Sequence, residues 1–157
     1  MVYATNMSEP INIFRPPNVV RRATAERRSG QYRERLLEVS ASLFVEHGIA
    51  RVSVEQLVKK AGVSRATFYG FFANKNELAG AILLPVFDSG SRALTNLNGL
   101  PPRQVAEKLV DIYLYLWKEH RNALLLTSSF DGVVFPYIKS KHDAFNAQLE
   151  KQLRIVE

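Results

Sequence analysis

The stretch that decides the fold is residues 52–78, which read VSVEQLVKKAGVSRATFYGFFANKNEL. Three residues within it are suited to cap the N-terminus of a helix, namely Ser53, Ser64 and Asn74. Serine or asparagine at such a position accepts hydrogen bonds from backbone N–H groups that have no partner inside the helix. Because the caps are spaced by eleven and ten residues, they predict two short helices and the start of a longer one.

The segment between the first two predicted helices has the composition of a tight turn. It consists of Ala61, Gly62 and Val63, and its central glycine permits a backbone with positive φ. A turn of this length allows two helices to cross near a right angle. Local chemistry alone therefore predicts a helix-turn-helix.

The segments on either side of this stretch are also helical in pattern. From Gln31 a stripe of apolar residues at helical spacing precedes Gly48, a residue suited to end a helix. This stripe consists of Leu36, Val39, Leu43 and Phe44. After Asn74 we expect a helix to about Phe87, which Pro85 kinks or ends, and then a polar stretch up to a turn at residues 99–102.

Three more helices are expected after that turn. They run from Pro102 to about His120, over residues 122–128, and from about Tyr137 to the end. No stretch shows a convincing alternation of the kind that strands require, so the predicted fold class is all-α. Residues 1–29, with several prolines and the pairs Arg21–Arg22 and Arg27–Arg28, are expected to form a flexible basic arm.

Composition and charge narrow the functional classes. The 157-residue chain has no cysteine, which excludes a disulfide scaffold and thiolate chemistry. No apolar run reaches the ~18–20 residues of a membrane span, so we expect a cytoplasmic protein without a membrane partner.

The net charge of +6 is unevenly distributed along the chain. Residues 1–79 carry twelve Lys/Arg against seven Asp/Glu (+5), and residues 80–157 carry nine against eight (+1). This favours a polyanion-binding first half, and a solvated basic surface without a partner is the alternative.

Residues 53–78 resemble the tetracycline-repressor (TetR) family, and the similarity covers roughly residues 31–80. Its most specific part is the run Ala61, Gly62, Val63, Ser64, followed by Thr67, Tyr69, Phe72, Lys75 and Leu78 at family spacing. The resemblance implies a dimeric DNA-binding regulator, usually a repressor, with a small-molecule effector pocket and a dimer interface in its C-terminal domain. Together with the arm at 1–29, the chain is therefore expected to contain a three-helix DNA-binding domain at 30–79 and, as the resemblance implies, a helical effector-binding and dimerisation domain at 80–157.

Two features depart from the family pattern. Phe71 occupies a position that is commonly a histidine, which often helps hold the DNA backbone, and phenylalanine cannot donate that hydrogen bond. Family members usually continue through two more long helices that build the dimer interface, whereas this sequence stops at Glu157. Either the chain is incomplete or its dimerisation differs. In the second case we expect the chains to pair through an apolar stripe formed by Phe145, Leu149, Leu153 and Val156.

The helix that starts at Ser64 is the candidate recognition helix. Phe68 and Phe72, four residues apart, are expected to face the core, which leaves Arg65 and Tyr69 on a different, outward face. Arginine reads guanine or grips phosphate, and free N–H groups at helix N-termini attract phosphate. The candidate DNA-binding residues are Ser53, Ser64, Arg65, Ala66, Thr67, Tyr69, Gly70 and Lys75. The alternatives are capping alone for Ser53 and Asn74, a solvated surface arginine for Arg65, and a partly buried structural tyrosine for Tyr69.

Other functions receive less support from the sequence. Its three histidines, His47, His120 and His142, are far apart and lack partners at metal-ligand spacing, so we expect no metal, no cofactor and no catalytic residues. A protein-interaction module is disfavoured by the basic residues around the predicted turn. Five aromatic residues are candidates for the effector pocket, with ordinary core packing as the alternative: Phe87, Tyr113, Trp117, Phe130 and Tyr137.

Overall fold

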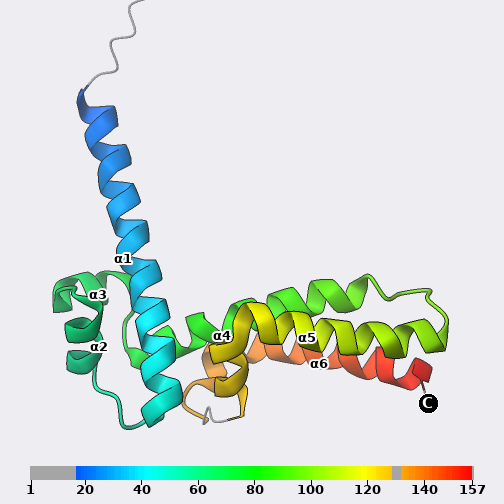
Figure 1. Cartoon of the computed structure of the whole chain (residues 1–157). Coiled ribbons are helices and arrows are strands. Elements are labelled where there is room, and N and C mark those ends of the chain that lie inside the picture. The colour runs from blue at the N-terminus through cyan, green and yellow to red at the C-terminus, as the bar shows by residue number, and fades with distance from the viewer. Residues whose placement is uncertain (1–16, 129–131, 157) are drawn as a thin grey trace, which may run out of the picture. The chain divides into compact units, whose positions relative to one another are not determined.

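The computed structural model describes residues 17–128 and 132–156, and within these ranges it contains six α-helices and no strand (Figure 1). The helices are α1 (Pro17–His47), α2 (Val54–Ala61), α3 (Arg65–Phe71), α4 (Lys75–Thr95), α5 (Pro102–Thr127) and α6 (Phe135–Val156). The predicted all-α fold class is confirmed. No helix in the described part of the chain combines the length and the apolar character needed to cross a bilayer.

The chain divides after Gln31 into two compact units. In the first unit, residues 17–31 form the beginning of α1, so the prediction of a flexible arm is wrong for residues 17–29, while residues 1–16 lie outside the described part. Two features of the sequence explain this helix. Pro17 stands at the first helical position, where its missing N–H costs nothing, and the following residues are rich in arginine and alanine, which favour helices.

The second unit starts at Tyr32, and its core joins the rest of α1 to the helices that follow. The fully buried side chains at the N-terminal end of this core come from four helices and from the loop that precedes α2. They are Leu36, Phe44, Val52, Leu57, Phe68 and Leu78. The predicted apolar stripe before Gly48 therefore supplies part of this core. Gly48 itself has φ 83°, as expected for a residue that ends a helix in the left-handed conformation.

The helix α4 is longer than the sequence pattern predicts, because Pro85 lies inside it and it continues to Thr95. A proline removes one backbone hydrogen bond and usually kinks or ends a helix. Here the residues that follow Pro85 are held by burial, with Val86, Phe87 and Leu94 all in the core. Tertiary packing stabilises a helix more than intrinsic propensity does, which explains why the polar segment after residue 87 is helical.

The helix α5 unites two predicted helices, the one up to His120 and the short one over residues 122–128. It is continuous from Pro102 to Thr127, but His120 has non-helical dihedral angles (φ −132°, ψ 31°). The ring Nε2 of His120 lies 3.2 Å from Ser89 Oγ of α4. The sequence pattern therefore locates the interruption correctly, and the structure shows that it is a kink rather than a loop.

The helices α4, α5 and α6 lie side by side and form a bundle (Figure 1). Two glycines of α4 allow α6 to approach closely. A Cβ added at Gly80 would lie 2.6 Å from Tyr137 Cβ, and one added at Gly90 would lie 2.5 Å from Phe145 Cε2. Glycine is required at the first of these positions because a Cβ is fixed to its helix backbone and cannot rotate away.

The stripe of α6 that the sequence offers for pairing with a second chain is largely used within the bundle. Phe145 and Leu149 are half-buried and pack against the apolar cluster of Leu94, Leu97 and Val105. Only Leu153 and Val156 of the stripe are exposed. The prediction of a four-residue pairing surface on α6 is therefore wrong, because α4 and α5 already cover half of it.

Candidate nucleic-acid interface

The turn between α2 and α3 has the geometry that its glycine predicts. Gly62 adopts the left-handed conformation (φ 67°, ψ 36°) and ends α2. Its N–H donates to Lys59 O at 3.3 Å, and the N–H of Val63 donates to Val58 O at 3.1 Å. This pair of bonds closes the helix end and fixes the direction in which the chain leaves it. The two short helices thus form a helix-turn-helix.

Both helices of this motif begin with the predicted serine caps. Ser53 Oγ accepts a bond from Gln56 N at 3.2 Å, and Gln56 Oε1 accepts one from Ser53 N at 2.8 Å, which completes a capping box. Ser64 Oγ accepts a bond from Thr67 N at 3.0 Å and lies 2.8 Å from Thr67 Oγ1. Each serine hydroxyl already serves a backbone N–H, so any contact with phosphate is additional to a capping role.

The helix α3 has one buried and one exposed face. Phe68 is fully buried, and its ring centroid lies 6.0 Å from that of Phe72, which is also in the core. On the exposed face lie Arg65, Ala66, Tyr69 and Gly70, whereas Thr67 is half-buried at the boundary. The arrangement leaves four of the candidate DNA-binding residues together on one accessible surface.

Arg65 has a partner that the sequence does not indicate. Its Nη1 lies 3.0 Å from Glu55 Oε2 of α2, ten residues earlier in the chain. A hydrogen bond with Tyr69, and then the charge of Glu55, raise the pKa of the Arg65 guanidinium. Both side chains of the ion pair are more than half exposed, so the pair contributes little to stability. Its effect is to hold the arginine near α2.

Lys75 has an internal role that the sequence does not reveal. Its ammonium group donates to three carbonyl oxygens of the loop between α1 and α2: Ile49 O at 2.9 Å, Ala50 O at 2.8 Å and Val52 O at 2.8 Å. An ammonium has three N–H donors, so these bonds occupy all of them. A contact between Lys75 and phosphate would require at least one of the bonds to break.

The N-terminus of α4 is capped as predicted, and its cap also contacts α6. Asn74 Oδ1 accepts bonds from Asn76 N and Glu77 N, both at 2.9 Å. The amide nitrogen of the same side chain donates to Tyr137 Oη at 3.0 Å. Asn74 therefore links the segment after α3 to the C-terminal bundle.

The structure does not bring together the aromatic residues proposed from the sequence for an effector pocket. Phe87 is buried between α4 and α6, where its ring contacts His142 and Phe145. Tyr113 and Trp117 stack on each other on an exposed face of α5, and Tyr137 contacts Asn74. Phe130 lies outside the described residues. The described members of this set therefore do not line one pocket, because their positions along the helices direct the side chains to different sides of the bundle.

A different group of residues lines an open groove of about 400 Å³ beside α1, α4 and α5. Apolar side chains of α1 and α4, among them Leu37, Ile82 and Pro85, form one part of the wall. Lys118, His120 and their neighbours at the kink of α5 form the other part. No sequence signal points to this groove, because it arises where α5 departs from regular helical geometry.

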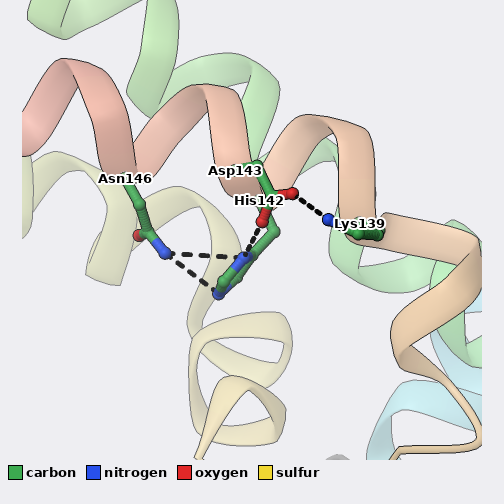
Figure 2. A network of polar contacts seen from close by, with 4 residues as sticks. All are labelled: Lys139, His142, Asp143 and Asn146. Atoms are coloured by element: carbon green, nitrogen blue, oxygen red, sulfur yellow. Dashed lines mark hydrogen bonds and ion pairs between the residues drawn. The ribbon is translucent and has the colours of Figure 1, made fainter.

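A polar network on α6 is a second place where titratable side chains gather (Figure 2). Asp143 pairs with Lys139 and lies 3.1 Å from His142 Nδ1, and Asn146 Nδ2 lies 3.1 Å from the other ring nitrogen of His142. Hydrogen bonds from Lys139 and His142 lower the pKa of the Asp143 carboxyl. All four residues lie on one helix within two turns, as side-chain pairs on an exposed helix do. Among the described residues no group of side chains is suited to hold a metal ion.

Comparisons with known proteins agree with this architecture. The model of the family described as bacterial regulatory proteins, tetR family, matches residues 36–82. YvdT of Bacillus subtilis (strain 168), an uncharacterized HTH-type transcriptional regulator, is 41% identical over 54 residues, which are 34% of this chain and 27% of that protein. SrpR of Pseudomonas putida, an HTH-type transcriptional regulator, is 31% identical over 65 residues, 41% of this chain and 30% of that protein.

A solved structure extends the similarity beyond the helix-turn-helix. The crystal structure of a transcriptional regulator (TerR/AcrR family) from Aquifex aeolicus VF5 is 29% identical, with a TM-score of 0.55, and the match covers 76% of this chain and 72% of that one. The chain nevertheless spans less than half the length of the curated relatives it matches, for example 27% of YvdT and 30% of SrpR.

A capped helix-turn-helix joined to a helical bundle defines the class of helix-turn-helix regulatory proteins. Within that class, residues 36–82 match the tetR family of bacterial regulatory proteins, and the relatives named above are HTH-type transcriptional regulators. The resemblance drawn from residues 53–78 is thus confirmed. The family and the relatives named are regulators, which agrees with the prediction that the chain is not an enzyme.

Proposed function

We propose that the chain binds a double-stranded DNA operator as a homodimer, with α3 in the major groove, and that it acts as a repressor released by a small-molecule effector. The observation that carries this proposal is the exposed face of α3, where Arg65, Ala66, Tyr69 and Gly70 lie together while Phe68 anchors the helix from behind. A helix of this kind, preceded by a tight turn, presents its first residues to base edges.

The charges near α3 support DNA as the partner. Arg51, Lys59 and Lys60 are exposed on α2 and on the loop before it, and Arg65 begins α3. Cationic side chains position a protein on the duplex through phosphates, whereas contacts with base edges supply the sequence preference. Within the proposal, Ala66 and the methyl group of Thr67 are suited to the methyl group of thymine, and the caps Ser53 and Ser64 lie at helix N-termini, which attract phosphate.

The open groove beside the kink of α5 is the proposed effector site. It combines apolar walls with a few polar groups, as small-molecule sites do. A ligand bound there would act by favouring a state whose two α3 helices no longer match half-sites about 34–36 Å apart. To test this part of the proposal, small apolar or amphipathic compounds are added to the operator complex, and release of the DNA is measured. We expect the variant Ile82→Asp to need a higher concentration of the compound for the same release.

The central experiment is a gel shift with DNA from upstream of the gene at several salt concentrations. We expect a discrete complex whose affinity falls steeply with salt, because phosphate contacts release counterions. A protein-interaction module would give no complex with any DNA, and that outcome would remove the proposal.

The variant Arg65→Ala tests whether the Arg65 side chain contacts the edge of a base. If Arg65 contacts a base, operator affinity should fall by about 1–3 kcal/mol and the preference at one base pair should relax. The matched control is Glu55→Gln, which removes the ion-pair partner of Arg65 and a negative charge near the DNA, and should raise affinity. An equal loss for Arg65→Ala on specific and random sequences would identify a phosphate contact instead.

The variant Lys75→Met separates the internal role of Lys75 from a contact with phosphate. Loss of three hydrogen bonds to loop carbonyls should lower the free energy of unfolding by about 1–2 kcal/mol, measured by urea denaturation. The salt dependence of DNA binding should keep its slope. A slope smaller by about one unit, with stability unchanged, would show that the ammonium neutralises a phosphate.

The variant Gly70→Ala tests how closely the backbone of α3 approaches DNA. Nothing lies within 4 Å of a Cβ added at Gly70, so alanine fits the free protein and should raise its stability by up to about 1 kcal/mol through helix propensity. If the backbone there lies against DNA, the methyl group should weaken operator binding at the same time. Unchanged affinity would place Gly70 away from the DNA.

A further inference from the structure

The first part of α1, residues 17–31, is a helical segment with an excess of positive charge. It is the helical part of the first compact unit and is here called the basic segment. It carries four arginines against one glutamate, a net charge of +3 out of +6 for the whole chain. Every residue from 22 to 31 is exposed, so packing against a core does not account for this composition.

Three arginines of the basic segment have no partner of their own. Within the part of the chain that the structure describes, Arg22, Arg27 and Arg28 make no hydrogen bond, ion pair or ring contact, and Glu26 pairs with none of them. A guanidinium group is planar and carries five N–H donors, which match the oxygens of a phosphate or a carboxylate. The segment therefore presents several unoccupied donors to an anionic partner.

The three arginines are distributed around the helix axis. At about 100° per residue, the directions of Arg22, Arg27 and Arg28 differ by about 100–140°, so they do not share one face. A flat anionic surface could meet only one or two of them at a time. A helix that lies in a groove of duplex DNA has a phosphate strand on either side, and the major groove, about 12 Å wide, admits an α-helix. This distribution therefore favours a duplex groove.

Other polyanions fit the basic segment less well. A helix that lies on a membrane surface needs a broad apolar face, and the only large apolar residues of the segment are the neighbours Val19 and Val20. Proteins that bind single-stranded nucleic acid stack bases on aromatic side chains, and residues 17–31 include no aromatic residue. Duplex DNA requires neither feature, because its phosphates are contacted by cations alone.

We propose that the basic segment binds the phosphate backbone of the DNA that flanks the half-site of α3, without reading its sequence. This inference rests on the proposed function, which supplies the duplex. If α3 occupies the major groove of the half-site, the phosphates open to a second element are those of the neighbouring duplex. A helix of this length spans about 22 Å, or roughly six to seven base pairs at 3.4 Å each.

The contacts have a consequence for affinity that differs from that of α3. Each phosphate contact on B-DNA adds about 0.9 to the slope of the logarithm of affinity against the logarithm of salt concentration. The basic segment therefore adds up to about three units to the slope through Arg22, Arg27 and Arg28. Phosphate contacts carry no sequence information, so the gain applies to operator and random DNA alike.

The first test is the double variant Arg27→Ala with Arg28→Ala, measured by gel shift on DNA with flanks of about 12 base pairs. The slope should fall by about two units, and binding at 0.1 M salt should weaken by roughly 10- to 100-fold. The circular dichroism spectrum and the urea unfolding curve should stay the same, because both side chains are exposed. An unchanged slope would overturn the proposal.

Two matched controls lie on the same segment. Gln31→Ala removes an exposed, uncharged side chain and should leave affinity and slope unchanged. Glu26→Gln removes the one negative charge of the segment and should strengthen binding severalfold, because a carboxylate repels phosphate. A loss for Gln31→Ala as large as that of the arginine variant, or weaker binding by Glu26→Gln, would contradict a phosphate contact.

The second test varies the length of the flanking DNA. The unaltered chain should bind more weakly, and with a smaller slope, when the flanks are shortened to about 2 base pairs, which is less than the reach of the segment. The double arginine variant should bind the short and the long fragments alike. Equal binding of both fragments by the unaltered chain would overturn the proposal, and so would an equal effect of the variant on both fragments.

The same measurements separate this inference from the proposed function. A discrete operator complex whose affinity depends neither on the arginines nor on the flanks would overturn this inference alone. Binding that depends on both, but with no preference for the operator over random DNA, would overturn the proposed sequence-specific function and support the basic segment as a DNA contact. If an acidic protein were the true partner, the arginine variant would bind DNA as the unaltered chain does, which again overturns the proposal.

Discussion

The variant Phe68→Ala should lower the free energy of unfolding by about 3–5 kcal/mol, the usual cost of deleting a fully buried aromatic ring. Phe68 has no exposed surface, and its ring contacts Tyr69 and Phe72 at the centre of the helix-turn-helix. The helix α3 has only seven residues, too few to be stable without packing, so this variant should also lose DNA binding. Urea denaturation followed by circular dichroism measures the first effect.

The neighbouring variant Tyr69→Ala is the matched control for Phe68→Ala. Tyr69 is 51% exposed, so its removal should change stability by less than about 1 kcal/mol. It should nevertheless weaken DNA binding if its hydroxyl contacts phosphate. A large loss of stability for Tyr69→Ala, or a small one for Phe68→Ala, would contradict the assignment of the two faces of α3.

The variant Gly80→Ala should lower the free energy of unfolding by about 2–3 kcal/mol, although alanine is the better helix former. The added Cβ would lie 2.6 Å from Tyr137 Cβ, and relief of that contact requires α6 to move away from α4. A thermal or urea unfolding curve measures the loss. The movement would also lengthen the bond between Asn74 and Tyr137.

The matched control for this second prediction is Gly90→Ala on the same helix. There the nearest atom is Cε2 of the Phe145 ring, at the far end of a side chain that can rotate. We expect a loss of about 1 kcal/mol or less, because the ring gives way while the backbone stays in place. Equal losses at Gly80 and Gly90 would show that the two helices adjust as freely at one position as at the other.

The local features of the fold can be predicted because they depend on neighbours in the sequence. Ser53, Ser64 and Asn74 cap the helices that their spacing predicts, and Gly62 has the positive φ that the turn requires. Each of these features is determined within about four residues. The family resemblance rests on the same local pattern, which explains why residues 53–78 alone are enough to recognise it.

The features that sequence patterns predict wrongly depend on contacts between distant segments. A proline usually kinks or ends a helix, but α4 continues past Pro85 because Val86 and Phe87 are buried in the core. Sequence pattern alone gives the apolar stripe on α6 no packing partner, but α4 and α5 partly cover Leu149 in the structure. Among the candidate site residues, the contacts of Lys75 are the hardest to predict. Its partners lie 23 to 26 residues away in the sequence, and they are backbone carbonyl oxygens, which every residue type has.

The two adjacent residues Asn74 and Lys75 reach in different directions, one to Tyr137 of α6 and the other to the loop between α1 and α2. This arrangement limits the coupling free energy that one contact can supply between the helix-turn-helix and the bundle. A signal that acts only by breaking the bond from Asn74 to Tyr137 has about 0.5–1.5 kcal/mol of coupling free energy available, a change of roughly twofold to tenfold in an equilibrium constant. A larger response requires α6 or α4 to shift as a rigid body, so that many contacts change together. The size of the effect of an effector would therefore show which of these two kinds of motion it causes.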